Sequence, residues 1–481
     1  MKFKSRRQTE YYYDEDEDER LPVRERDGHF SSRNRGNASR SSPLRTSGRE
    51  AAGRRRERNT SRPVQSFFAA LALFLGAGFL FLFAGAWIRS ADARAGGAGV
   101  IPAVIEELIP ESVQKAVSGE AGDALPEGEQ VAGEDPAAPF VASESISYIS
   151  PGHYLLRETQ APDLVTFSFA GDILFDERYA PAAFALQNGG DITASFDAAS
   201  LAVMRTADVM FVNNEFPYSD RGEPTEGKAY TFRASPARAR WLSALGVDLT
   251  GLANNHAYDY GEAAFLDTLD TLDEAGILRV GGGRNLEEAC RPCVFEAGGF
   301  RIAVINATQI ERLDNPDTRG AGEDTPGVFR CFDDTRLLEV IRRSGEEADF
   351  VIVTIHWGTE STHEADWLQT SRIQAMAEAG ADLVVGAHPH VLQGIDYAGD
   401  MPVVYSLGNY LFSSYTTDTG ILQVTFRPSQ KRMTQLRFVP MLQSGCRVAA
   451  LDGGEKARVL EELRSWSPNA SVDGDGIITK R

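Results

Sequence analysis

Short apolar runs alternate with segments of helical periodicity from about residue 164 onward. The runs are rich in β-branched residues and are bounded by turn residues, as in "LVTFSFAGD", "DFVIVTIHWG" and "DLVVGAHPH". Between them, stretches such as "GEAAFLDTLDTLDEAG" and "DWLQTSRIQAMAEAG" repeat their apolar residues with the period of a helix. Continuous apolar runs separated by helices are typical of buried strands, so the pattern predicts an α/β layered domain.

The most apolar stretch of the chain precedes that domain. Residues 66–88 carry no charge, and a helix of this length can span the hydrocarbon core of a bilayer. We predict one transmembrane helix, because a secretory signal would lie closer to the N-terminus. Arginines are dense before the span and sparse after it, at Arg54, Arg55, Arg56, Arg58 and Arg62 against Arg89 and Arg94. The positive-inside rule then predicts a single-pass type II protein of the plasma membrane, with its C-terminal domain extracytoplasmic.

The segments that flank the span lack the pattern of a folded core. Residues 1–62 mix acidic residues with Arg, Ser, Asn and Gly without periodicity, which predicts a disordered cytoplasmic tail. Residues 89–160 are rich in Ala, Gly, Pro and Glu, which predicts a tether that holds the folded part away from the lipid. We therefore expect the domain at residues 161–445 and a C-terminal extension at residues 446–481.

Charge and cysteine content narrow the classes of function. The formal net charge of −20 opposes contact with a polyphosphate backbone, which argues against nucleic acid as a partner. Four cysteines are too few for a disulfide framework in a chain of this length. The "CRPC" pair, Cys290 and Cys293, could be a redox motif or half of a zinc site. Because Cys331 and Cys446 stand alone, a local disulfide or two unpaired thiols is the plainer interpretation.

Side chains able to bind a metal recur directly after the apolar runs. They are Asp172, Glu215, Asn254, Asn255, His256, His356, His388 and His390. In open α/β sheets, sites form outside the carboxyl ends of the strands, where loops converge. Imidazole, carboxylate and amide oxygens are ligands that divalent transition metals accept. A single histidine after a strand is more often structural, but four at equivalent positions indicate a metal centre.

Seven blocks in order carry a family resemblance. They are "FAGDILFD", "NNEFP", "YTFRASP", "GLANNHAYDYG", "HWGTE", "GAHPHVLQG" and "VVYSLGNYLF". Over about residues 165–441 the chain resembles the CapA family of poly-γ-glutamate capsule biosynthesis proteins, which is similar in turn to calcineurin-like metallophosphoesterases. The resemblance implies a metallophosphoesterase-like four-layer α/β/β/α sandwich. It also implies a centre of two divalent metal ions, for which Mn, Fe, Zn and Mg are not distinguished.

The resemblance implies a role for each motif residue. The metal ligands would be Asp172, Glu215, Asn255, His356, His388 and His390. His256 would be the catalytic acid that protonates a leaving group. Arg233 and Asn254 would contact the substrate, because Arg suits carboxylate or phosphate, although a surface ion pair is an equal alternative for Arg233. Asp259 and Tyr260 are expected to organise the loop, and Asn409 either lines the site or caps a turn.

The sequence also departs from the phosphoesterase pattern. The usual opening Asp-x-His pair is missing, because "TFSFA" precedes "GDILFD", so one metal could lack a ligand. Asn213 and Asn214 precede Glu215 where the CapA pattern commonly has Asn-Leu-Glu, which keeps the carboxylate and adds an amide. We therefore still predict a metal site at these residues, but the sequence does not determine its detailed geometry.

Two functions from different classes fit these observations. The first is a metal-dependent hydrolase, phosphoesterase-like, that acts on an anionic envelope polymer or its precursor. The second is a non-catalytic anchoring or export subunit that holds the polymer at a relic metal site and joins other membrane subunits of a synthesis machine. A phosphatase that shares only the fold also stays open, since fold does not fix function.

Overall fold

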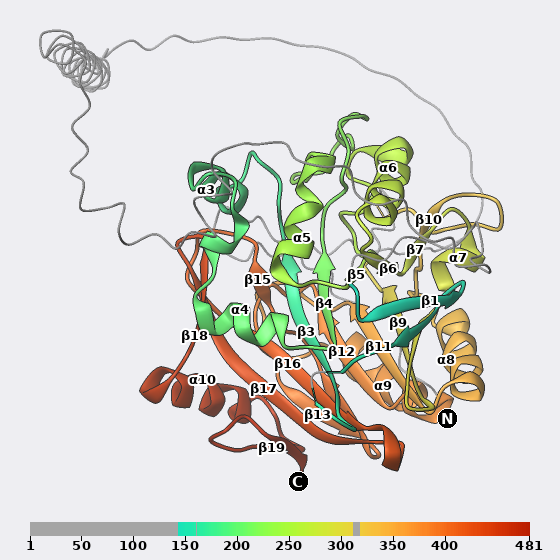
Figure 1. Cartoon of the computed structure of the whole chain (residues 1–481), viewed down its shortest axis with the longest axis vertical. Helices are drawn as coiled ribbons and strands as arrows, with labels where there is room; N and C mark the ends of the chain where they lie inside the picture. The colour runs from blue at the N-terminus through green and yellow to red at the C-terminus, as the bar shows by residue number, and fades with distance from the viewer. Residues whose placement is uncertain (1–142, 160, 311–317) are drawn as a thin grey trace, which may run out of the picture. The chain divides into compact units, whose positions relative to one another are not determined.

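The computed structural model describes residues 143–159, 161–310 and 318–481 (Figure 1). The predicted cytoplasmic tail and the predicted span at 66–88 lie outside the described residues, as does most of the predicted tether. Within the part of the chain that the structure describes, no helix is both long and apolar enough to cross a membrane.

The first sheet has eight strands and places four parallel strands at its centre. In spatial order these are β1 (Ile146–Ser150), β2 (His153–Leu156), β8 (Cys293–Ala297), β9 (Phe300–Thr308), β11 (Phe350–His356), β12 (Leu383–Ala387), β14 (Met401–Val404) and β13 (Ile395–Ala398). Strands β9, β11, β12 and β14 run parallel, so their carboxyl ends share one edge of the sheet. The prediction of a tether up to residue 160 needs correction, because β1 and β2 extend this sheet through pairing with β8.

The second sheet joins a parallel half to an antiparallel half. Its strands are β18 (Arg447–Ala450), β17 (Arg432–Ser444), β16 (Thr417–Arg427), β3 (Val165–Ile173), β4 (Val209–Asn214), β5 (Leu249–Gly251) and β6 (Leu278–Val280), and β15 (Asn409–Leu411) also pairs with β3. Strands β3 to β6 are parallel, whereas β16, β17 and β18 pair antiparallel. Two small ribbons complete the strands, β7 (Gly282–Gly283) with β10 (Gly327–Val328) and β19 (Ala470–Val472) with β20 (Ile478–Lys480).

Helices cover the outer faces of both sheets. The second sheet is covered by α3 (Ala180–Gln187), α4 (Ala198–Arg205), α5 (Arg240–Leu245) and α6 (Gly261–Glu274). The first sheet is covered by α7 (Leu286–Cys290), α8 (Thr335–Glu347) and α9 (Trp367–Ala379). The short 3-10 helices are η2 (Ile192–Ser195), η3 (Pro236–Arg238) and η4 (Pro428–Gln430). The order helix, sheet, sheet, helix is the predicted α/β/β/α sandwich.

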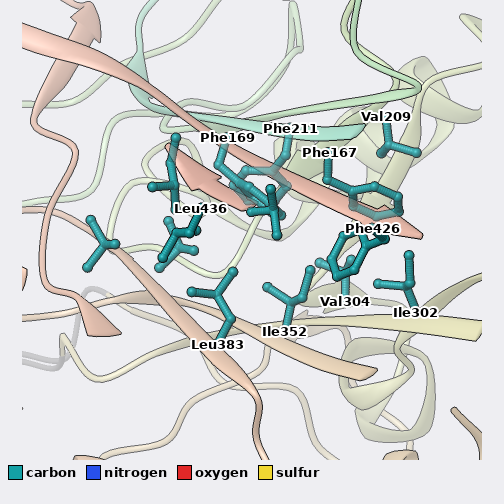
Figure 2. Packing of buried hydrophobic residues seen from close by; sticks show 14 of the residues in the cluster. Phe167, Phe169, Val209, Phe211, Ile302, Val304, Ile352, Leu383, Phe426 and Leu436 are labelled. Carbon is teal, nitrogen blue, oxygen red and sulfur yellow. The ribbon is translucent and has the colours of Figure 1, made fainter. Parts of the chain in front are cut away.

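The main core lies between the two sheets. Figure 2 shows Phe167, Phe169 and Phe211 of the second sheet in one apolar cluster with Ile302 and Ile352 of the first, among other residues. The ring of Phe426 meets that of Phe167 edge to face at 5.7 Å, and such pairs add to the roughly 1.5–3 kcal/mol that burial of each side chain contributes. This core fixes the spacing of the sheets, and with it the distance between their carboxyl ends.

The segment after residue 445 belongs to the same body. Helix α10 (Gly453–Ser465) contributes Leu460 and Leu463 to the cluster between the sheets, and the β19–β20 ribbon contributes Val472 and Ile478. The predicted C-terminal extension is therefore part of the sandwich, because its apolar residues are buried against β17 and β13 rather than left in solvent.

Candidate metal centre

Strand ends from both sheets bring the predicted ligands together. Asp172 lies near the end of β3, Glu215 follows β4, and Asn255 follows β5, all in the second sheet. His356 ends β11 of the first sheet, and His388 follows β12. These side chains are buried, although they are polar. Buried polar groups of this density require partners, so their contacts define what the site can hold.

The turn after β12 is strained in a way that aims two imidazoles at the cluster. His388 and His390 have φ angles of 98° and 60°, on either side of Pro389. A positive φ is costly for a residue with a Cβ, and such outliers concentrate at functional sites. The His388 ring approaches His356, and the His390 ring approaches Asp172. The two histidines therefore serve two neighbouring positions.

The first position surrounds the Nε2 atom of His356. This atom lies 2.8 Å from Asn255 Oδ1, 3.1 Å from His388 Nδ1 and 3.2 Å from Glu215 Oε1. One ring N–H cannot satisfy three acceptors, so the four atoms converge with too few protons among them. Both carboxylate oxygens of Glu215 are buried without a hydrogen bond from any described residue. A cation at this position would satisfy all four ligand atoms.

The second position surrounds Asp172. Its Oδ2 atom lies 3.3 Å from His390 Nδ1, and its Oδ1 atom accepts a 2.7 Å hydrogen bond from the side-chain amide of Asn213. Asp172, Glu215 and His390 each offer a ligand atom within 4.8 Å of the others, and so do Glu215, His356 and His388. Because Glu215 belongs to both groups, the residues fit two adjacent cations with a shared carboxylate.

A third carboxylate extends the site. Glu360, His388 and His390 form another group whose ligand atoms lie within 4.8 Å, and Glu360 Oε1 is 3.7 Å from His388 Nε2. Sequence reasoning missed Glu360, although the block "HWGTE" contains it, because it stands in a loop four residues after β11 rather than at the strand end. Its partial exposure places it at the open side of the cluster.

Burial and mutual charge shift the titration of the cluster. Burial lowers the pKa of His356 to about 3 and holds the pKa of His388 well below its ordinary value. Burial, helped by the charge of Asp172, raises the pKa of Glu215 to about 8. Burial also opposes the charge of His390, but Glu215 and Asp172 outweigh it and raise that pKa well above its ordinary value. Neutral imidazole is the form that binds metal, which His356 and His388 already have, whereas His390 would release its proton when a cation takes the place of that charge beside Asp172 and Glu215.

His256 belongs to a separate dyad beside the cluster. Its Nδ1 atom lies 2.6 Å from Asp259 Oδ2, which also accepts a 2.7 Å hydrogen bond from the backbone N–H of Phe232. The other carboxylate oxygen of Asp259 lies 2.6 Å from the buried ammonium of Lys228, which donates as well to the backbone carbonyl of Asn255. This network fixes the imidazole and ties it to the loop that carries a metal ligand.

Three further predicted residues lie around these groups. The Asn254 side chain is buried, donates to the backbone carbonyl of Asn214 at 2.9 Å and accepts from the His256 N–H, so it braces the turn. Asn409 Oδ1 lies 2.8 Å from His390 Nδ1 and orients that ring. Arg233 is outside the metal cluster and lies over the ring of Tyr260.

The sequence that carries this site matches the model of a known protein family. The family described as bacterial capsule synthesis protein PGA_cap matches residues 166–414, which contain every predicted site residue. The chain belongs to this family.

Relatives in the capsule synthesis family are moderately similar to this chain. It is 26% identical over 330 residues to the PGA biosynthesis protein CapA of Bacillus subtilis (strain 168), covering 67% of this chain and 83% of that protein. It is 31% identical over 225 residues to the capsule biosynthesis protein CapA of Bacillus anthracis, covering 45% and 53%. A probable polyglutamine synthesis accessory protein of Mycobacterium tuberculosis is 26% identical over 266 residues, covering 52% and 70%.

A solved structure described as a novel phosphatase from Mycoplasma pneumoniae aligns with 58% of this chain and 94% of its own. The TM-score is 0.36 and the sequence identity is 14%. What this member of the capsule synthesis family can do therefore rests on its own residues. The group around Asp172 contains one imidazole, that of His390, whereas the group around His356 contains two, those of His356 and His388.

Proposed function

We propose that this chain is a metal-dependent hydrolase of capsule or poly-γ-glutamate synthesis, acting outside the plasma membrane on an anionic envelope polymer or its precursor. The observation that carries the proposal is the buried Glu215 carboxylate, which has no hydrogen bond from the described residues and is shared by two groups of ligand atoms. A carboxylate so placed is costly unless a cation balances it. The metallophosphoesterase-like assignment of the sandwich is part of the same proposal.

The residues divide into two roles. Asp172, Glu215, Asn255, His356, His388 and His390 would hold the cations, with Glu360 as an added ligand. When bound, a pair of divalent ions activates water and stabilises negative charge on the attacking and leaving oxygens. His256 transfers a proton at its Nε2 atom, since its Nδ1 atom is held by Asp259. Asp259 fixes the orientation of the ring, as an acidic partner does in other His–Asp pairs.

Metal content tests the proposal first. Elemental analysis of the purified full-length chain should find one to two transition metal ions, and the His388→Ala, His390→Ala double variant should lose them. His153→Ala is the matched control, because His153 is half-buried on β2 with Glu347 as its near partner and is outside the metal groups. Absence of bound metal in the folded wild type would leave a non-catalytic subunit that holds or exports the polymer.

Turnover tests it second. The metal-loaded protein should hydrolyse a model phosphodiester or a γ-glutamyl oligomer, and His256→Ala should slow this by about 100-fold or more while metal stays bound. The hydrolase proposal would be contradicted by two results together. The metal-loaded protein would show no turnover, and its variants would leave polymer output in cells unchanged.

Membrane anchoring through residues 66–88 is proposed together with the chemistry. The bilayer, an anionic polymer and other membrane subunits of a synthesis machine are the proposed partners. An alkaline phosphatase fusion at the C-terminus should be active in intact cells if the domain is extracytoplasmic. If a reporter that fluoresces only in the cytoplasm is fluorescent at the same place, and the phosphatase fusion is inactive, the C-terminal domain is cytoplasmic and the predicted topology is wrong.

A further inference from the structure

One arginine near the His256–Asp259 dyad stands out because it forms no ion pair with a described residue. Three arginines in this region have carboxylate partners: Arg178 with Asp176, Arg221 with Asp267, and Arg238 with Glu177. Arg233 has no carboxylate partner among the residues that the structure describes. In a chain of net charge −20, one uncompensated guanidinium at this place calls for an explanation.

The Arg233 guanidinium is held in one orientation. Its centre lies 4.1 Å from the ring centroid of Tyr260, a cation–π contact, and its Nη1 atom donates to the carbonyl oxygens of Arg221 at 3.1 Å and Gly222 at 3.3 Å. Gly222 has a φ of +87°, and a Cβ there would lie 2.0 Å from the Tyr260 carbonyl oxygen, so only glycine lets this loop close. Within the described part of the chain no acceptor is bonded to the Nε and Nη2 atoms of Arg233.

Two neighbours complete what we name the arginine platform, formed by Arg178, Arg233 and Tyr260. The Arg178 guanidinium lies 5.7 Å from the same ring, and its contact with Asp176 neutralises it. Asp176 also accepts a 2.8 Å hydrogen bond from the backbone N–H of Arg233. Asp176 thus fixes the backbone of Arg233 and takes its charge partner from Arg178, which leaves the Arg233 charge available.

The platform is next to the dyad along two separate segments. Arg233 follows Phe232, whose ring packs on His256 with centroids 4.3 Å apart and whose N–H bonds Asp259. Tyr260 follows Asp259, whose Oδ2 atom lies 2.6 Å from His256 Nδ1. The guanidinium is therefore one residue removed from both groups that contact the proposed proton donor.

We propose that Arg233 binds an oxyanion of the substrate, a carboxylate or a phosphate, adjacent to the bond on which the centre acts. The proposal rests on the proposed function for the identity of that bond. A planar guanidinium with free adjacent donors matches either oxyanion in a two-pronged contact. The contact with Tyr260 orients the guanidinium in advance, which lowers the conformational entropy lost on binding. Because the guanidinium is positively charged, Arg233 would select chains that carry a negative group on the unit next to the scissile link.

Calorimetric titration of the full-length, metal-loaded chain tests this site with three probes. They are a γ-linked glutamate pentamer, the same pentamer with its free carboxylates amidated, and inorganic phosphate. Arg233→Gln should weaken binding of the acidic pentamer by about 10-fold to 100-fold, the range of a charged hydrogen bond, and leave the amidated pentamer unchanged. If Arg233→Gln weakens the binding of inorganic phosphate by that factor and leaves the binding of both pentamers unchanged, the oxyanion is a phosphate.

Matched variants keep the result interpretable. Arg233→Lys retains the charge without the fork and should fall between wild type and Arg233→Gln, and it replaces that variant if the latter does not fold. Arg240→Gln is the control, since Arg240 is exposed at the start of α5 and should change binding less than about twofold. Equal losses in Arg240→Gln and Arg233→Gln, or no loss for any probe, would overturn the proposal.

Metal content and turnover, measured on the same samples, separate this inference from the proposed function. If the wild type takes up no metal when metal is supplied, and Arg233→Gln still loses binding of the acidic pentamer relative to it, the oxyanion site is supported and the proposed hydrolase is contradicted. If Arg233→Gln has normal metal content and turnover and binds all three probes as the wild type does, the hydrolase is supported and the oxyanion site is contradicted.

Discussion

The same strands build two regions with opposite physical character. Strand β3 gives Phe167 and Phe169 to the core between the sheets and Asp172 to the metal cluster, and β11 gives Ile352 to the core and His356 to the cluster. The core is apolar and closely packed, whereas the cluster buries carboxylates and imidazoles with too few protons among them. The core therefore stabilises the fold without a ligand, and the cluster should do so only when a cation is bound.

The largest expected effect is on the core side of this comparison. Phe167→Ala removes a fully buried ring that packs against Phe295 and Phe426, and we expect a loss of about 3–5 kcal/mol in the free energy of unfolding. The loss should be equal with Mn²⁺ and with a chelator, as measured by urea unfolding. Leu155→Ala on β2 is the control, because Leu155 is 37% exposed. A loss that depends on the metal would mean that the two regions are not separable.

A smaller effect is expected where the dyad meets the cluster. Asp259→Asn keeps the shape of the side chain but removes the charge that fixes His256, so turnover of a model phosphodiester should fall by about 100-fold, or roughly 2.7 kcal/mol. Metal content should not change, since Asp259 belongs to none of the ligand groups. Parallel loss of metal and turnover would show that the network through Lys228 holds Asn255 in place and that Asp259 acts through structure alone.

The core was easier to predict from sequence than the site. The apolar runs predicted the buried strands and the layered class, because a run such as "FVIVTI" has few other stable environments. The ligands directly after strands could be named for the same reason, since strand ends converge at one edge. The pattern missed residues whose place is set by loops, such as Glu360 and Lys228, because loop paths depend on tertiary packing that no local period records.

The domain limits show the same division. Residues 143–159 directly follow the Ala- and Pro-rich segment, and their two apolar runs, ISYIS and HYLL, are short, so the sequence alone assigns β1 and β2 to the tether. Their pairing with β8 depends on a partner more than 130 residues away, as the register of His153 with Val294 shows. The missed helix α10 is likewise stabilised by burial of Leu460 and Leu463 rather than by any motif.

The smallest expected effect reverses sign between the two states of the site. Glu215→Gln removes a buried charge without changing shape, and in the chelated protein we expect it to raise the free energy of unfolding at pH 8 by about 1 kcal/mol. The pKa of Glu215 is raised in the fold from 4.5 to about 8, so its stabilising contribution is present below about 4.5 and is lost as pH rises to about 8. The advantage of the variant should therefore grow over that interval and vanish at its acid end.

Saturating Mn²⁺ should invert that order. A free Mn²⁺ concentration of 100 times the dissociation constant raises the free energy of unfolding of the wild type by about 2.7 kcal/mol. The variant lacks the shared carboxylate, so its free energy of unfolding should rise by less. Urea unfolding at pH 5 and pH 8, with and without metal, gives the four comparisons. If Glu215→Gln is less stable than wild type in chelator at pH 8, the carboxylate has a protein partner that stabilises it, and the cluster is then a structural polar network rather than a cation site.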